Sequence, residues 1–188
     1  MTRRARRRVW PAAFGLALWL AIATPALAIE RFFGTYVGDA ELVDLATGTV
    51  QERDVITVIQ NHGERGFRID WQSVVRVDGR RDVPGVRLFV RTAAFDRARG
   101  ATYFLQSPDY DPFRIRETLE PMAGDALAWA AVEGDDLHLY IFALTDQGVA
   151  ELQHHRRRLT DDGMELVYQG IVDGRLTSHA AGHMVKVD

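Results

Sequence analysis

The sequence predicts an all-β fold: a single antiparallel up-and-down β-barrel of about ten strands after an N-terminal signal peptide. Three observations predict it. Apolar and polar residues alternate with a period of two in several segments, turn signals rich in Gly and Asp recur along the chain, and few stretches sustain the 3.6-residue period of a helix. An open sheet of that size would leave two unpaired edges, and closure into a barrel removes both.

The first 28 residues have the three parts of a secretory signal peptide. Five arginines and no acid precede the apolar run VWPAAFGLALWLAIATP, and the small residues Ala26 and Ala28 are typical of a cleavage site. We expect cleavage after Ala28 and a periplasmic or secreted protein, with an uncleaved N-terminal anchor as the alternative. Residues 1–28 are thus predicted as the signal peptide and residues 29–188 as one β-barrel domain.

The charge of the predicted mature chain argues against nucleic acid as a partner. The whole chain has 23 Lys and Arg against 26 Asp and Glu, and loss of the arginine-rich signal peptide makes it still more acidic. Such a surface repels phosphate backbones. The chain has no cysteine, so a lipid-anchored cysteine is excluded and the fold must rest on its hydrophobic core. We predict no membrane span in the mature chain.

The first half of the domain contains five candidate strands joined by short loops. The clearest is GFRIDWQSVVRV, in which Phe67, Ile69 and Trp71 alternate with Arg68 and Asp70, as on a strand that is buried on one side. Because the loops are short, neighbours in sequence should pair in the sheet. The five candidates are residues 31–44, 50–61, 66–77, 86–94 and 101–106.

Residues 107–125 separate the two halves of the domain. This segment contains three prolines and shows no clean period. Connections of such length inside a compact domain are usually functional or disordered. We expect the segment either to form a lid over a cavity or to pack on the barrel wall.

The second half of the domain predicts a meander of five strands. Its apolar segments are separated by GDD, TDQG, TDDG and DG, whose Gly and Asp residues adopt the positive φ angles that tight hairpins require. Consecutive strands should therefore pair antiparallel. The five segments begin at Ala126, Leu137, Val149, Met164 and Arg175.

RFFGTYVG, at the start of the first strand, resembles the Gly-x-Trp signature with which lipocalins and fatty-acid-binding proteins, members of the calycin superfamily, begin their barrels. The resemblance implies a calycin-like barrel with an internal pocket, in which Gly34 packs closely at the closed end and Tyr36 plugs that end. Arg175 is a candidate for the late arginine that covers the plug in that superfamily. The sequence differs from lipocalins, which add a helix after the barrel, and from fatty-acid-binding proteins, which insert two helices after the first strand.

No residue pattern indicates catalysis or a metal centre. His154 and His155 are adjacent on a predicted strand, so their side chains point to opposite faces, and the other histidines are solitary or too far apart to share one ion. Neither a Gly-x-Ser-x-Gly motif nor a Gly-rich phosphate loop is present. We predict that the protein is not an enzyme and uses no cofactor or metal. An active site that pairs His154 with Glu151 or Asp146 is the enzymatic alternative.

The predicted function is non-catalytic binding of a small apolar or amphipathic molecule inside the barrel. Aromatic residues on strands would form the pocket wall, and the basic segment HHRRRL would supply an arginine for an acidic group. If Leu152 points inward, so do Arg156 and Arg158, whereas the opposite parity directs Arg157 inward. The candidate ligand-binding residues are Phe67, Ile69, Trp71, Trp129, Tyr168, Arg156 and Arg158.

An interaction or structural module in the cell envelope is the alternative hypothesis. In that case the barrel is filled with side chains, and an exposed strand edge or the long loop binds a protein partner. The two hypotheses differ in whether the barrel encloses free space.

Overall fold

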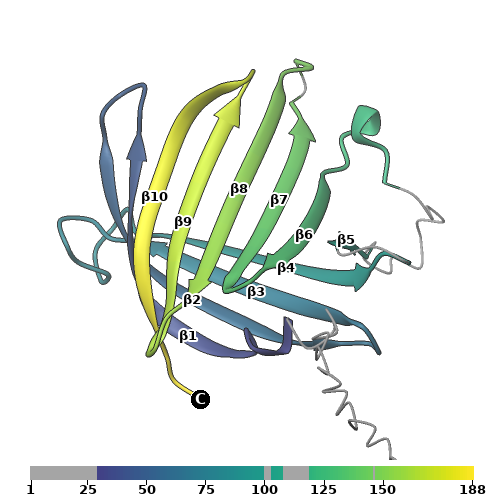
Figure 1. The fold of residues 1–188 in the computed structure, drawn as a ribbon. Coiled ribbons are helices and arrows are strands. Elements are labelled where there is room, and N and C mark those ends of the chain that lie inside the picture. Colours follow the sequence, from purple (N-terminus) through teal and green to yellow (C-terminus); the bar gives the residue numbers. More distant parts are fainter. Residues whose placement is uncertain (1–28, 100–102, 108–118, 146) are drawn as a thin grey trace, which may run out of the picture.

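The structure is a computed structural model that describes residues 29–99, 103–107, 119–145 and 147–188. The predicted signal peptide lies outside the described residues, and so does most of the segment 107–125. The structure therefore does not test the expected lid. The predicted fold class is confirmed, because strands make up 68% of the structure and close into one antiparallel up-and-down barrel (Figure 1). Within the described residues, no helix is both long enough and apolar enough to cross a bilayer.

Ten strands follow one another around the barrel in sequence order, each antiparallel to its neighbours, and the last strand pairs with the first. Their bounds lie close to those predicted from the alternation of residues. Among the described residues, the 3₁₀ turn η1 (Pro121–Ala123) lies between the two halves. The strands are β1 (Gly34–Asp44), β2 (Val50–His62), β3 (Gly66–Val75), β4 (Arg87–Arg97), β5 (Tyr103–Gln106), β6 (Leu127–Glu133), β7 (Asp136–Leu144), β8 (Ala150–Leu159), β9 (Gly163–Val172) and β10 (Arg175–Lys186).

The hairpin between β9 and β10 shows how the turn residues set the strand pairing. Asp173 and Gly174 have φ angles of 49° and 74°, the left-handed conformation that a two-residue hairpin of this twist requires. Arg175 therefore lies opposite Val172, and the two strands pair along most of their length. Gly134 and Gly148, in the turns before β7 and β8, also have positive φ angles as predicted, whereas none of residues 160–163 in the turn before β9 has one.

One half of the barrel interior is filled by large apolar side chains. The rings of Phe67 and Phe95 stack with centroids 4.9 Å apart, and Phe104 meets Phe67 edge-on at 5.2 Å. Leu137 and Met164 are fully buried from the other side of the ring of strands. Burial of each such side chain is worth about 1.5–3 kcal/mol, so this packed half is the main source of stability.

The filled half lies at the end of the barrel where β1 begins at Gly34, β6 ends at Glu133 and β10 ends at Lys186. The segment before β1 contributes to this half. Phe32 is fully buried there, and the hydroxyl of Tyr36 donates a hydrogen bond to its carbonyl over 3.1 Å. The ammonium group of Lys186 lies 5.7 Å from the centroid of the Tyr36 ring. This half of the barrel is therefore the closed end.

The pairing of β1 with β10 forms the seam that closes the barrel. It runs from Tyr36 opposite Lys186 to Asp44 opposite Ser178. Beyond the last strand, the Asp188 carboxylate accepts hydrogen bonds from the backbone N–H of Thr35 at 2.5 Å and from its hydroxyl at 2.8 Å. The segment after the barrel is thereby joined to the start of β1 at the closed end.

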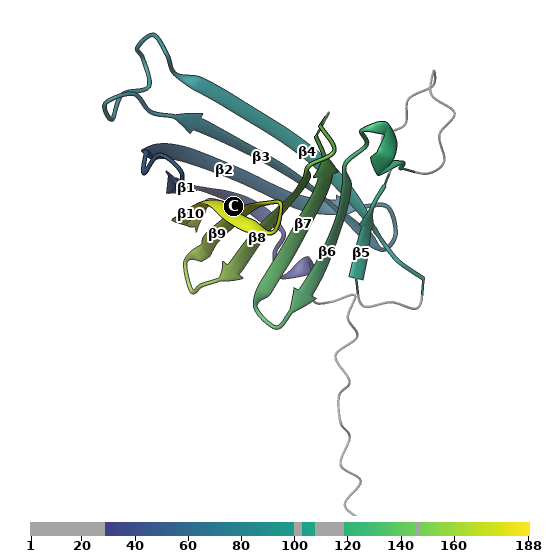
Figure 2. The same ribbon diagram turned by 90° about the horizontal axis from the view of Figure 1, so that it is seen from above.

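β5 is the shortest strand of the barrel wall, with only four residues. It pairs with residues 95–97 of β4 and with residues 129–131 of β6. Residues 87–93 of β4 therefore pair with β3 on one side, and no other strand of the described chain pairs with them on the other side. In Figure 1 β6 rises away from β4 above β5, and Figure 2 shows β4 and β6 running in different directions.

Close backbone contact at the seam makes Gly38 a sensitive position. A Cβ atom on Gly38 would lie 2.0 Å from the carbonyl oxygen of His183 and 2.7 Å from the Cα atom of Met184. Gly38→Val should lower the free energy of unfolding by about 1–3 kcal/mol, because β1 and β10 must move apart. Urea denaturation measures this loss. Ala181→Val, on the exposed face of β10, adds methyl groups at the same seam and should change stability little; equal losses for both variants would contradict the account.

A candidate ligand cavity in the open half of the barrel

The half of the barrel opposite the packed core is hollow. A cavity of about 380 Å³ lies inside the wall formed by β1 to β4 and β8 to β10. The cavity opens to solvent at a mouth beside Phe89 and Val90, whose side chains are exposed. A volume of this size lies in the range of small-molecule sites. The alternative of a completely filled barrel therefore does not hold.

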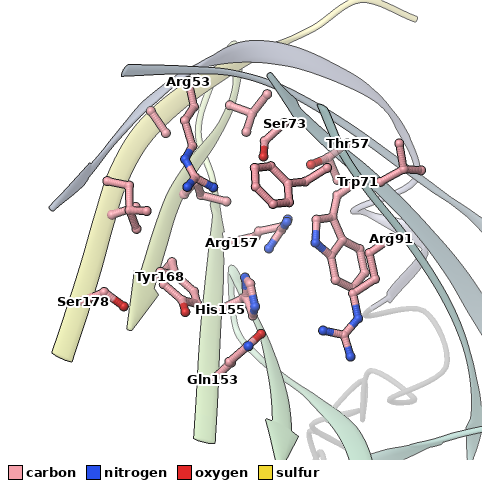
Figure 3. A pocket seen from close by; sticks show the side chains of 17 residues that line it. Arg53, Thr57, Trp71, Ser73, Arg91, Gln153, His155, Arg157, Tyr168 and Ser178 are labelled. Atoms are coloured by element: carbon pink, nitrogen blue, oxygen red, sulfur yellow. The ribbon is translucent and has the colours of Figure 1, made fainter. Parts of the chain in front are cut away.

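The lining of the cavity combines apolar and polar side chains, as Figure 3 shows. Its apolar part includes Leu42, Val55, Trp71, Phe89 and Leu166. The polar part carries three guanidinium groups, one imidazole, one phenol and several neutral groups. These polar residues are Arg53, Thr57, Ser73, Arg91, Gln153, His155, Arg157, Tyr168 and Ser178.

Arg157 on β8 is the most unusual residue of the lining. Its side chain is only 2% exposed, and Nε and Nη1 have no hydrogen-bond partner among the described residues. Burial lowers the pKa of its guanidinium to about 10, so it still carries a full charge at neutral pH. A buried cation without a partner costs several kcal/mol, and proteins keep such groups where function requires them.

His155 precedes Arg157 by two residues on β8 and faces the same interior. Its ring packs between Trp71 and Tyr168, with centroid distances of 5.9 Å and 4.9 Å. Burial, together with the positive charges of Arg157 and Arg91, lowers the pKa of its imidazole to about 3. His155 is therefore neutral at physiological pH, and its buried Nε2 has no partner in the described chain.

Arg53 and Arg91 enter the cavity from β2 and β4 (Figure 3). Burial is the main cause that lowers the pKa of both guanidinium groups, and repulsion from Arg87 lowers that of Arg53 further. Arg53 donates one hydrogen bond to the Gln51 side chain at 2.8 Å, whereas its buried Nε has no partner among the described residues. The guanidinium of Arg91 lies 5.8 Å from the centre of the Trp71 ring.

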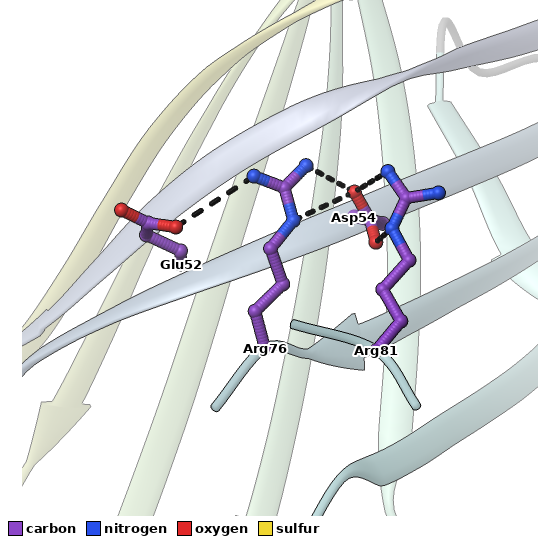
Figure 4. A network of polar contacts seen from close by, with 4 residues as sticks. All are labelled: Glu52, Asp54, Arg76 and Arg81. Atoms are coloured by element: carbon purple, nitrogen blue, oxygen red, sulfur yellow. Dashed lines mark hydrogen bonds and ion pairs between the residues drawn. The ribbon is translucent and has the colours of Figure 1, made fainter. Parts of the chain in front are cut away.

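The acidic residues of β2 are paired with arginines on the outer wall of the barrel. Asp54 follows Arg53 on β2 and points outward, where it pairs with Arg76 and with Arg81, the latter at 2.6 Å (Figure 4). The hydrogen bond from Arg76 is the largest cause that lowers the pKa of this carboxyl. Arg76 also approaches Glu52 at 3.7 Å. The network ties the connection between β3 and β4 to the wall and leaves the cation of Arg53 without a carboxylate from this cluster.

The structure brings two of the predicted pocket residues into the cavity. Trp71 and Tyr168 both line it. Phe67 and Ile69 also point into the barrel, as predicted from the alternation in β3, but they are fully buried in the packed half and do not line the cavity.

Trp129 lies on the outer wall and not in the pocket. Its neighbours Ala128 and Ala130 are the buried residues of β6, so the tryptophan points away from the interior. Its ring stacks on Tyr140 at 5.2 Å, and Tyr140 stacks on His154 at 4.6 Å. The interior beside β6 is already filled by Phe104 and its neighbours, which leaves room only for small side chains.

The predicted inward parity of Arg156 and Arg158 is wrong. Both side chains lie on the outer wall, where Arg158 donates two hydrogen bonds to Asp136 at 2.9 Å and 2.8 Å. The prediction relied on an inward Leu152, which instead lies opposite Phe142 of β7 on the outer face. The alternative parity, with Arg157 inside, is the one observed. Sequence reasoning missed the register between β8 and β9. In that register His155 lies opposite Tyr168, which is already predicted to line the pocket, so His155 and Arg157 face inward as well.

The residues of the resemblance motif lie at the closed end. Tyr36 is 1% exposed, and a Cβ atom on Gly34 would come within 2.4 Å of the Lys186 side chain. Arg175 lies at the opposite end of β10 and is exposed, so the cation over the Tyr36 ring is Lys186. The assignment of Arg175 to that position is wrong.

The histidines do not gather around a common metal position. His138 Nδ1 and His154 Nε2 are 2.9 Å apart on the outer wall, a hydrogen-bond contact that sequence reasoning missed because it treated His138 as solitary. No group of three potential metal ligands occurs in the described part of the chain. Glu151 accepts a hydrogen bond from Gln153 at 2.7 Å, and Asp146 lies outside the described residues. Because His154 faces outward, the predicted enzymatic pairing is not assembled inside the cavity.

Comparison with known proteins adds no functional assignment. No family model and no curated protein matches the chain. Among solved structures, the S-type phycobiliprotein lyase CPES from Guillardia theta is similar, with 12% sequence identity and a TM-score of 0.44. The match covers 85% of this chain and 90% of that chain. At that level of likeness, nothing known of the lyase carries over to this protein.

The buried neutral His155 predicts a pH-dependent stability. Because its pKa is about 3 in the folded protein and about 6.5 in an unfolded chain, the unfolded state binds more protons between these values. The free energy of unfolding should therefore fall as the pH drops through this window, by up to about 1.4 kcal/mol per unit from this residue. Urea denaturation between about pH 7 and about pH 5 should show a shallower fall in His155→Gln than in the wild type. The exposed His62→Gln is the control and should keep the wild-type slope; an unchanged slope in His155→Gln would show that His155 does titrate in the folded barrel.

Proposed function

We propose that the protein binds a small amphipathic molecule in the hollow half of its barrel and does not change it chemically. The observation that supports this most is a cavity of about 380 Å³ whose wall carries aromatic and apolar groups beside unpaired polar ones. Apolar walls hold a ligand through burial, and a few convergent polar groups fix its orientation. That the protein is not an enzyme remains a prediction.

We also infer an exported protein with a calycin-like barrel. Export is supported by the sequence of residues 1–28, with its arginines, apolar run and small residues before position 28. The calycin-like assignment is supported by the up-and-down order of the strands and by the position of Gly34 and Tyr36 at a closed end. Mass spectrometry of the N-terminus of the protein from its natural source tests the cleavage after Ala28.

Filling the cavity should weaken ligand binding. Ser73 lines the cavity, and the adjacent Gln72 is exposed on the outer face of β3. We expect the wild type to bind one anilinonaphthalene sulfonate per chain with increased fluorescence, and Ser73→Phe to weaken binding at least tenfold, about 1.4 kcal/mol. Gln72→Phe adds the same ring outside the barrel and should bind as the wild type does. Wild-type affinity in Ser73→Phe would contradict the proposal.

Protein interaction is the second candidate function, and it is favoured by the edge of β4 with which no other strand of the described chain pairs. Ser107 donates its backbone N–H to the Ala94 carbonyl at 2.8 Å, so the backbone groups of even-numbered residues in β4 point toward that edge. Further along the edge, Leu88 and Val90 are each 60% exposed. An extended segment of a partner adds to such an edge by main-chain hydrogen bonds, with apolar side chains contributing affinity.

Proline at this edge should remove the interaction without disturbing the cavity. Leu88→Pro deletes an N–H that points away from β3, so the pairing of β3 with β4 is kept. A partner found by chemical cross-linking in envelope extracts of the natural host should be lost with Leu88→Pro and kept with Ser73→Phe. Loss with Ser73→Phe alone would instead connect the partner with the cavity.

A further inference from the structure

The cavity carries more positive charge than its own residues balance. Arg53, Arg91 and Arg157 line it, and no Asp or Glu is among its lining residues in the described ranges. Glu151 is the carboxylate that acts on this group, since it attracts Arg91 and also raises the pKa of Tyr168. It offsets one cation of three. Arg87 repels Arg53 but is exposed to solvent and does not line the cavity, so it is left out of this count.

We propose that the ligand carries two negative charges on its polar part, as a phosphate monoester, a phosphonate or a pair of carboxylates does. This inference rests on the proposed function and specifies its ligand class. Two negative charges balance what remains of the three guanidinium groups once Glu151 is counted. A single carboxylate leaves a buried cation without compensation, which is costly in an environment of low dielectric constant.

Unpaired hydrogen-bond donors support this ligand class independently of the charge count. Nε and Nη1 of Arg157 and Nε of Arg53 are buried and have no partner in the described chain. Guanidinium groups bind phosphate and carboxylate oxygens through two parallel N–H donors, so these positions match an oxyanion with several acceptor atoms. The neutral imidazole of His155 adds a further polar group to the cavity without adding a charge.

The arginines of the outer wall show that the excess is confined to the cavity. Arg158 pairs with Asp136 at 2.8 Å, and Arg76 pairs with Asp54. Arg156, next to Arg157 in sequence, approaches Asp136 at 3.8 Å. Neighbouring residues of β8 thus differ in one respect: the outward cations have carboxylate partners, and the inward cation does not.

Three ligands with the same alkyl chain and different charge test the inference. Octyl phosphate, octanoate and octanol are titrated into the protein at about pH 8, where the phosphate monoester carries close to two charges because its second pKa is near 6. Isothermal calorimetry gives the affinities, and a change in tryptophan fluorescence that is lost in Trp71→Phe and kept in Trp129→Phe reports entry into the cavity. We expect octyl phosphate to bind at least tenfold more tightly than octanoate, and octanoate more tightly than octanol.

Variants of β8 assign the effect to the cavity. Arg157→Met should weaken octyl phosphate at least tenfold and leave octanol unchanged, while Arg156→Met, the matched control on the outer face, should bind all three as the wild type does. Arg157→Met should also raise the melting temperature of the ligand-free protein, because it removes an unpaired buried charge. A rise in stability combined with a loss of binding cannot be explained by misfolding.

The possible failures are distinguishable. Octanoate and octyl phosphate affinities within a factor of two would overturn the doubly charged ligand and leave the proposed function standing. Equal weakening by Arg156→Met and Arg157→Met would overturn the assignment to the interior arginines. If none of the three compounds binds, both the ligand class and the proposed function are wrong.

Discussion

The backbone hydrogen bonds that join β1 to β10 are the constraint on which the rest of the structure depends. Once the ring of strands is closed, every residue of every strand is assigned to the inside or the outside by its position alone. The seam therefore decides that Tyr36 lies at the closed end of β1 and Leu42 in the cavity. Because a shift by one residue would exchange the two faces, the close backbone contacts of Gly38 and Gly182 help hold the register.

The two halves of the interior have opposite physical characters. Near Phe67 and Phe104, aromatic and aliphatic side chains fill the space and supply the free energy of folding. Near Arg157 and His155, the chain accepts buried polar atoms without partners, which opposes folding. The free energy gained in the packed half thus offsets the free energy lost in the polar half, as is common where a binding site is built into a small domain.

Much of the fold was predictable from local patterns, whereas parity in β8 was not. The alternation of Phe67, Ile69 and Trp71 against charged residues fixed the inner face of β3, since one face there is apolar and the other polar. In β8, basic residues occur on both faces, so alternation does not distinguish them. An apolar Leu152 does not mark the inner face of β8, because the outer wall here is itself apolar, with Phe142 and Ile171 beside it. Register counted from the turn before β9 places His155 opposite Tyr168, and that relation identifies the inner face.

The shortness of β5 has a consequence for how the wall moves. Segments held by few hydrogen bonds open at the lowest free energy, so amide exchange in this barrel should be fastest around β5 and slowest along β9 and β10. Separation of β5 from residues 95–97 of β4 would part the wall over the packed rings of Phe95 and Phe104. Water would then reach the filled half of the interior, so the protection of its aromatic core would depend on the stability of one short strand.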